Sequence, residues 1–230
     1  MQSNKRTARI AGLLYLIVVL TGMFSLAYVP SQINVGDDAA ATVRNLIAHE
    51  SLFRLGIVAG LVCYVAFLLL PLALYKLLSP HGRQWASVMV AFAVVSVPLA
   101  IAATLNKFEV LSLLSGADHL QAFSAEALQA RVILALDAYR NGLLATQIFW
   151  GLWLLPFGVL VYKSGILPRL LGVLLVMGCF GYLIDFAGRM LFPAYPEAGV
   201  GGFVRLPAAL GEIGTCLWLL VMGAREKSMR

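Results

Sequence analysis

Apolar residues in this chain fall into six long runs, separated by shorter polar segments. A helix of about 20 apolar residues crosses the roughly 30 Å hydrocarbon core of a bilayer. The runs are long enough to do so, which predicts an all-α membrane protein with a six-transmembrane-helix bundle. The expected spans are near residues 10–29, 53–76, 86–106, 141–162, 170–191 and 204–222.

The composition agrees with that pattern and excludes a soluble domain. Of the 230 residues, 61% are hydrophobic and only 12% are charged, whereas soluble domains carry about 25% charged residues. No polar stretch is long enough to form a second unit, so residues 1–230 are expected to form one integral membrane domain. The net charge of +6 does not indicate nucleic acid as a partner, because the basic residues sit at the ends of the apolar runs.

The distribution of basic residues predicts the orientation of the helices. Lys and Arg accumulate in the cytoplasmic loops of membrane proteins. The side that carries the N-terminus collects ten of the 17 basic residues and one acid, Glu226. Both termini are therefore expected to be cytoplasmic. The ten basic residues are Lys5, Arg6, Arg9, Lys76, Arg83, Lys163, Arg169, Arg225, Lys227 and Arg230.

The outer loops contain helical signals of their own. Residues 37–50 begin with Asp37-Asp38 and then place Val43, Leu46 and Ile47 on one face. An amphipathic segment of this kind is typical of a short helix that lies in the membrane interface.

A second signal precedes the fourth span. Ser124 is followed by Ala-Glu, a helix start, so residues 124–139 are expected to run into the fourth helix. Pro71, Pro98 and Pro156 lie inside expected spans and predict kinks.

Two parts of the chain resemble each other. Residues 53–59 match residues 139–145, and Leu69–Pro71 match Leu154–Pro156 with a small slip in spacing. Two interpretations remain open: a tandem hairpin repeat, or chance similarity between apolar helices.

Ionisable residues inside a membrane are costly and usually face the bundle interior or a cavity. Here they gather near the outer ends of the helices, which predicts an outward-facing charged pocket. The candidate ligand-binding residues are Arg54, Glu109, Arg140, Asp185, Arg189, Arg205 and Glu212.

Three of these, Arg54, Arg140 and Arg205, open helices that run inward from the outer side, where the helix dipole opposes a cation. Either they extend to the lipid headgroups, partly neutralised by neighbours such as Glu50 or Asp137, or they pair with carboxylates in a shared cavity.

The acidic candidates are expected to be paired. Asp185 and Arg189 stand four residues apart on one helical face. Glu212 should face the interior with an arginine in salt-bridge reach, because Gly211 and Gly214 beside it allow close helix approach. The paired residues would bind a ligand or only fix the helix register.

No motif assigns a reaction. The histidines lie outside the expected spans, and no HxxxH, HExxH, CxxC, GxSxG, Walker or dinucleotide signature occurs. We therefore expect no metal and no cofactor. Cys63, Cys179 and Cys216 lie inside apolar runs and are interpreted as packing residues.

Several segments are similar to those of a known family. They are the run Arg9–Leu16, the pair Phe53-Arg54 and the segment Glu212–Trp218. Together they resemble an uncharacterised bacterial family of multi-pass membrane proteins, domain of unknown function 4386. The resemblance implies a six-helix bundle in the plasma (inner) membrane of a bacterium, and it supplies no activity or site residues.

Three functions are compatible with these residues. The first is the binding or transport of a small anionic or amphiphilic molecule such as a lipid, which the arginines would attract electrostatically. The second is a structural or regulatory membrane subunit without a ligand. The third is a membrane enzyme with Glu212 or Asp185 as acid–base group. Membrane lipids are the expected partners, and a homo-oligomer is compatible with the pattern.

Overall fold

A computed structural model describes residues 2–36 and 38–224, and this part of the chain contains helices and no strands. The α-helices are α1 (Gln2–Met23), α2 (Val29–Ile33), α3 (Ala39–Ala48), α4 (Glu50–Leu78), α5 (Arg83–Leu113), α6 (Ala125–Leu152), α7 (Leu154–Ser164), α8 (Arg169–Leu191) and α9 (Val200–Val221). Three short segments join them: the π-helix η1 (Phe24–Tyr28) and the 3-10 helices η2 (Ser79–His81) and η3 (Asp118–Ala122).

Six helical stretches within the described residues are long and apolar enough to span a membrane, as the sequence predicts. The first joins α1, η1 and α2, and the fourth joins α6 and α7. In the most apolar window of each stretch, between 28% and 56% of the residues are buried within the protein. The remaining apolar side chains face outward, where lipid would cover them. The chain is therefore a multi-pass integral membrane protein.

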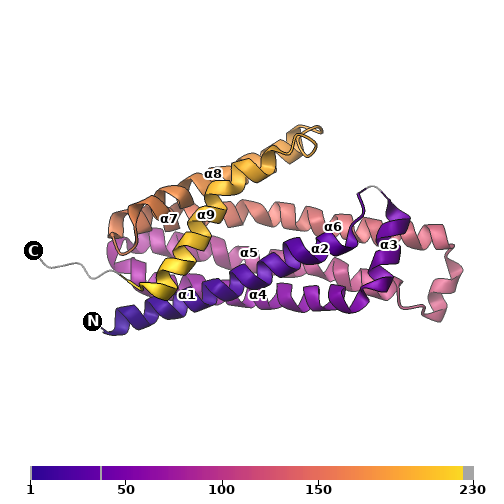
Figure 1. The fold of residues 1–230 in the computed structure, drawn as a ribbon, viewed down its shortest axis with the longest axis horizontal. Helices are drawn as coiled ribbons and strands as arrows, with labels where there is room; N and C mark the ends of the chain where they lie inside the picture. The colour runs from indigo at the N-terminus through magenta and orange to yellow at the C-terminus, as the bar shows by residue number, and fades with distance from the viewer. Residues whose placement is uncertain (1, 37, 225–230) are drawn as a thin grey trace, which may run out of the picture.

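The start of α1 and the end of α9 lie at one end of the bundle, while α3 and η3 lie at the other (Figure 1). Gly223, just after α9, packs against the backbone of Lys5. An even number of spans brings the two ends of a chain to the same side. Which side is cytoplasmic stays a prediction. Of the basic residues behind it, Arg225, Lys227 and Arg230 lie outside the described residues.

The helix expected over residues 37–50 is present as α3. Asp38 caps it by accepting a hydrogen bond from the Ala41 backbone N–H at 2.8 Å, and Asp37 lies outside the described residues. Val43 and Leu46 are buried against neighbouring helices, whereas Ile47 is 61% exposed. The apolar face therefore packs mainly on the protein, and its position in the membrane interface stays a prediction.

Helix α6 begins where the sequence predicts and ends at Leu152, four residues before a proline. The Ser124 side chain accepts a hydrogen bond from the Ala127 N–H at 3.2 Å, and α6 runs without a break from Ala125 to Leu152. Proline has no N–H to offer the carbonyl four residues earlier. Pro156 therefore leaves the Leu152 carbonyl without its helical partner, and the helix breaks into α6 and α7 at that point.

A second proline reshapes the first span. Pro30 cannot pair with the carbonyl of Leu26, and its ring crowds that group. The helix widens there into the π-helical segment η1, in which the Val29 N–H bonds to the Phe24 carbonyl, five residues back. A π-helical turn of this kind redirects side chains and often borders a functional site.

The middle helices are longer than the expected spans. Helix α5 has 31 residues, which corresponds to about 46 Å against the roughly 30 Å of hydrocarbon. It continues to Leu113, beyond the predicted end at residue 106, so Lys107 lies inside the helix. The extension is stabilised by a second apolar cluster that includes Leu46, Ile57, Val110 and Val132.

Glycines bring the last helices into close contact, as expected from small residues in membrane helices. A Cβ added to Gly178 on α8 would lie 2.7 Å from Cα of Ala208 on α9. Between α7 and α8, Gly158 and Gly172 each face the carbonyl oxygen of the other. The Gly178 contact holds α8 and α9 as a tight hairpin, and the Gly158–Gly172 contact fixes α7 against α8. The α8–α9 hairpin positions the charged residues described below.

We expect Gly178→Ala to destabilise the protein by about 1–3 kcal/mol, because the new methyl group overpacks the α8–α9 contact. Gly202→Ala is the matched control, since a Cβ there meets open space. Thermal unfolding in detergent should show a lower Tm for the first variant alone. Equal Tm values would contradict this packing.

Labelling tests the proposed orientation. Single cysteines are introduced at Asp118 and Arg83 in a chain whose native Cys63, Cys179 and Cys216 are replaced by alanine. A membrane-impermeant maleimide added to intact cells should label the cysteine at position 118 and spare the one at 83, since Lys and Arg favour the cytoplasmic side. The reverse pattern would overturn the orientation.

Candidate functional site

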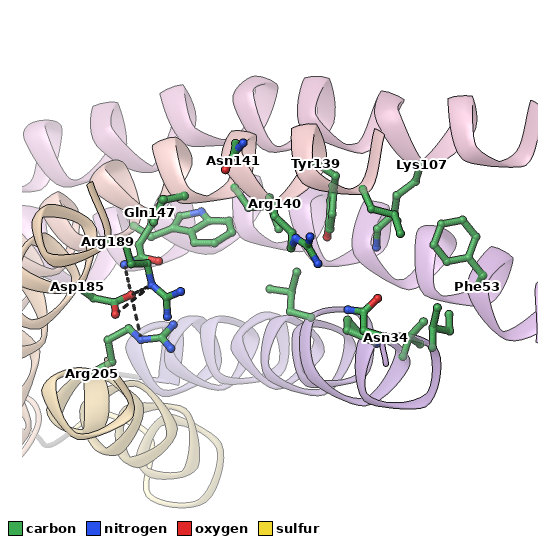
Figure 2. A pocket seen from close by; sticks show the side chains of 18 residues that line it. Asn34, Phe53, Lys107, Tyr139, Arg140, Asn141, Gln147, Asp185, Arg189 and Arg205 are labelled. Carbon is green, nitrogen blue, oxygen red and sulfur yellow. Dashed lines mark hydrogen bonds and ion pairs between the residues drawn. The ribbon is translucent and has the colours of Figure 1, made fainter. Parts of the chain in front are cut away.

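A cavity of about 490 Å³ lies between the first span and helices α4, α5, α6, α8 and α9. We refer to it as the central cavity. Figure 2 shows its polar side chains: Asp185, Arg189 and Arg205 gather at one end, and Arg140 and Lys107 point into the space from the opposite side to Asn34. Its apolar wall includes Leu26, Val29, Pro30, Ile33, Leu136, Leu143, Leu144 and Trp150.

Asp185 is the centre of the polar cluster. Its side chain is fully buried, and both carboxylate oxygens accept from Nε of Arg189, at 3.2 and 3.3 Å. Nε of Arg205 lies 3.5 Å from Oδ2, and Nε2 of Gln147 donates to Oδ2 at 3.0 Å. One buried carboxylate therefore joins α6, α8 and α9. The pairing of Asp185 with Arg189 that the sequence predicts is confirmed.

The backbone of α9 approaches this carboxylate closely. Gly201 is buried against Asp185, and any side chain at that position would overlap Oδ1. Arg205 also donates from Nε to the Gly201 carbonyl at 3.3 Å. The first turn of α9 is thus shaped around the Asp185 group.

Lys107 is the second polar feature of the cavity. Only 4% of this residue is exposed, and within the described residues no carboxylate lies in ion-pair distance of it. Its Nζ lies 4.1 Å from the ring centroid of Tyr139 and 5.7 Å from that of Phe53. Aromatic faces attract a cation, but they do not neutralise its charge.

Phe53 and Tyr139 are the first residues of the two similar sequence segments. They come from α4 and α6, which run in the same direction, and they flank Lys107 on α5. Equivalent positions of the two segments thus place an aromatic residue beside the same lysine, whether or not the segments share an origin.

The two remaining candidate arginines, Arg54 and Arg140, each pair with an acidic residue on the same helix. Nε of Arg54 lies 2.6 Å from Oε1 of Glu50, and Arg140 donates to Asp137. Both arginine side chains are more than half exposed. This is the neutralisation by Glu50 and Asp137 that the first interpretation of these arginines predicts. Arg140 lines the central cavity as well.

The cavity carries an excess of positive charge. Its lining contains Lys107, Arg140, Arg189 and Arg205 but one carboxylate, Asp185. Asp137 offsets Arg140, and Asp185 can offset one of its two arginines. Lys107 and one guanidinium charge are left without compensation from the described residues.

The structure brings four of the seven predicted site residues to the central cavity: Arg140, Asp185, Arg189 and Arg205. Arg54 and Glu109 are exposed and do not line it. Glu212 also lies outside it, in a neighbouring cavity. The prediction that an arginine pairs with Glu212 is wrong within the described residues. Glu212 is instead hydrogen-bonded to Tyr15, whose hydroxyl donates to Oε1 at 3.1 Å.

Sequence reasoning missed Lys107, Gln147 and Tyr139 as members of the site. The signal for Lys107 was its place after an unbroken apolar run, which we interpreted as the end of the span. Gln147 is a buried amide within an expected span, and this was the available signal. For Tyr139 the available signal was its alignment with Phe53 at the start of the two similar segments.

Comparison with known proteins places the chain in a family without assigning an activity. The sequence profile described as "Domain of unknown function (DUF4386)" matches residues 10–223. A protein of Archaeoglobus fulgidus, named only "Uncharacterized protein", is 32% identical over 90 residues, which is 39% of this chain and 51% of that protein. The match thus spans about half the length of this relative. No solved structure matches the chain.

The Asp185 cluster predicts a large difference between two carboxylates. We expect Asp185→Asn to lower the stability by about 1–3 kcal/mol, because it leaves the buried Gln147 amide and the two partly exposed arginines without their charged acceptor. Asp137→Asn removes an exposed ion pair and should cost about 0–1 kcal/mol. Thermal unfolding of both variants in detergent checks this, and equal Tm values would show that the Asp185 cluster does not stabilise the hairpin.

Proposed function

We propose that this chain, which belongs to the family of domain of unknown function DUF4386, binds a small anionic or amphiphilic molecule such as a lipid in its central cavity. The observation that carries the proposal is the excess of cationic side chains around one cavity. Lys107 is the clearest of them, because it is buried, faces the cavity and has no carboxylate partner in the described residues. A bound anion would supply that partner.

The walls of the central cavity favour an amphiphile over a small inorganic anion. Leu26, Val29, Leu143 and Trp150 form much of the lining between the charged groups. A ligand with an anionic group and an apolar part would match both kinds of surface. The volume of about 490 Å³ lies within the range of small-molecule sites.

The depth of the charged groups supports a lipid headgroup. Lys107 lies 24 residues beyond Arg83, which corresponds to about 36 Å along α5. If Arg83 is at one surface of the hydrocarbon, Lys107 is at the headgroup level of the other. With the N-terminus in the cytoplasm of a bacterium, the cavity would face outward from the inner membrane. In this proposal the orientation follows from the basic residues, and the bacterial inner membrane follows from the family resemblance.

A second function is favoured by the Asp185 cluster. The carboxylate joins three helices, as expected of a polar group that assembles a bundle. A structural or regulatory subunit would need this cluster. It would not need Lys107, whose charge contributes no ion pair to the described assembly, and for that reason we place ligand binding first.

Lys107→Met tests the proposal. The probe is dioctanoyl phosphatidylglycerol, titrated into purified protein in a nonionic detergent and followed by calorimetry. The Kd should rise about tenfold in the variant, because a charge-assisted hydrogen bond contributes about 1.5–3 kcal/mol. Lys76→Met is the matched control, since Lys76 is exposed near the opposite end of α4, and its Kd should equal that of the wild type.

Two outcomes would contradict the proposal. One is the absence of saturable binding to the wild-type protein. The other is an equal Kd for the Lys107→Met and Lys76→Met variants, which would mean that the probe binds elsewhere on the surface. Dioctanoyl phosphatidylcholine, whose headgroup has no net charge, should bind more weakly than the anionic probe.

A further inference from the structure

A second cavity, of about 430 Å³, adjoins the first and differs from it in chemistry. We refer to it as the aromatic cavity. Leu26, Trp150 and Arg205 line both cavities, so the two share a wall. The aromatic side chains in its lining are Tyr15, Tyr64, Phe67, Trp150, Trp153 and Tyr182.

Glu212 is the acidic residue among those that line the aromatic cavity. It lies nine residues before the end of α9 at Val221, about 14 Å along the helix and close to the middle of the membrane. Tyr15, its hydrogen-bond partner, lies at a similar depth on α1, about 16 Å from Asn4. In the described chain no Lys, Arg or His makes an ion pair with Glu212. This contrasts with the other carboxylate of the two cavities, Asp185, which has two arginine partners.

The rings around Glu212 are fixed in position. Trp153 is 1% exposed and stacks on Phe157 with a centroid distance of 5.1 Å. The Phe67 ring is perpendicular to that of Trp153, with a centroid distance of 5.0 Å, and the Tyr15 ring centroid lies 6.3 Å from that of Trp153. This packing already fixes the rings, so a ligand would not have to order them when it binds. Such preorganisation favours affinity.

We propose that the aromatic cavity binds a lipophilic organic cation, with its charge near Glu212 and its apolar groups on the surrounding rings. The faces of Trp and Tyr attract an organic cation through their negative electrostatic potential, and they do so most strongly when water is excluded. A carboxylate near the middle of a bilayer is costly unless it is paired. A bound cation would pair with the Glu212 carboxylate and contact the aromatic faces.

Arg205 is the charged group that could oppose such a ligand, since it also lines the aromatic cavity. Its Nε lies 3.5 Å from Oδ2 of Asp185 and donates to the Gly201 carbonyl. The guanidinium is therefore held toward the central cavity and toward a negative charge. This leaves the Glu212 carboxylate as the dominant charge for a ligand among the rings.

The test uses two probes of nearly the same shape and opposite charge, tetraphenylphosphonium and tetraphenylborate. Binding to the purified full-length protein is measured by equilibrium dialysis and by quenching of tryptophan fluorescence, to which Trp150 and Trp153 contribute. The two probes are compared in the Lys107→Met variant, which lacks the key cation of the proposed anion site. There tetraphenylphosphonium should bind saturably and tetraphenylborate at least about tenfold more weakly. Glu212→Gln should raise the Kd for the cation by about tenfold or more, whereas Glu197→Gln, in the exposed loop after α8, should leave it unchanged.

A second variant separates binding from folding. Tyr182→Leu keeps the Glu212 carboxylate and removes one ring, so it should weaken cation binding severalfold. Equal binding of the two probes to the Lys107→Met variant, or unchanged cation binding in both the Glu212→Gln and Tyr182→Leu variants, would overturn the proposal. Lys107→Met should leave cation binding intact, so this site and the anion site of the central cavity succeed or fail independently.

Discussion

The low polarity of the bilayer interior governs the arrangement of this protein. A charged group in hydrocarbon must find a partner, water or the membrane surface, and the ionisable residues of the two cavities differ in how they do so. Asp185 is buried and collects two arginines and Gln147. Arg54 and Arg140 stay exposed beside their own acidic neighbours. Lys107 and Glu212 have no ion pair within the described chain, and each of them lines a cavity.

Two cavities of opposite character follow from that arrangement. The central cavity has an excess of positive charge near one surface of the membrane, and the aromatic cavity has a carboxylate near the middle. They meet at Leu26, Trp150 and Arg205. The π-helical segment forced by Pro30 sets the position of Leu26, and Trp150 precedes the break that Pro156 causes. Helix irregularities with identifiable causes therefore shape the wall between the cavities.

The sequence was sufficient for much of the fold. Runs of apolar residues determine the six spans, and Asp38 and Ser124 mark helix starts. The four-residue spacing determines the pair of Asp185 and Arg189. Each of these features depends on residues that are close together in the chain. The end of α5 was misplaced, since a polar residue in a long apolar helix can be read as its boundary. The partner of Glu212 was also missed. A contact between α1 and α9 depends on packing across 197 positions of sequence, which no local pattern reveals.

The central claim is that Lys107 receives its counter-charge from a bound anion. The most direct measurement is an experimental structure of the protein in lipid nanodiscs that contain phosphatidylglycerol. We expect headgroup density in the central cavity, with a phosphate in ion-pair distance of Nζ of Lys107 and an acyl chain along the Leu143 wall. Lys107 paired with a carboxylate of the protein, or a central cavity filled only with water, would contradict the account.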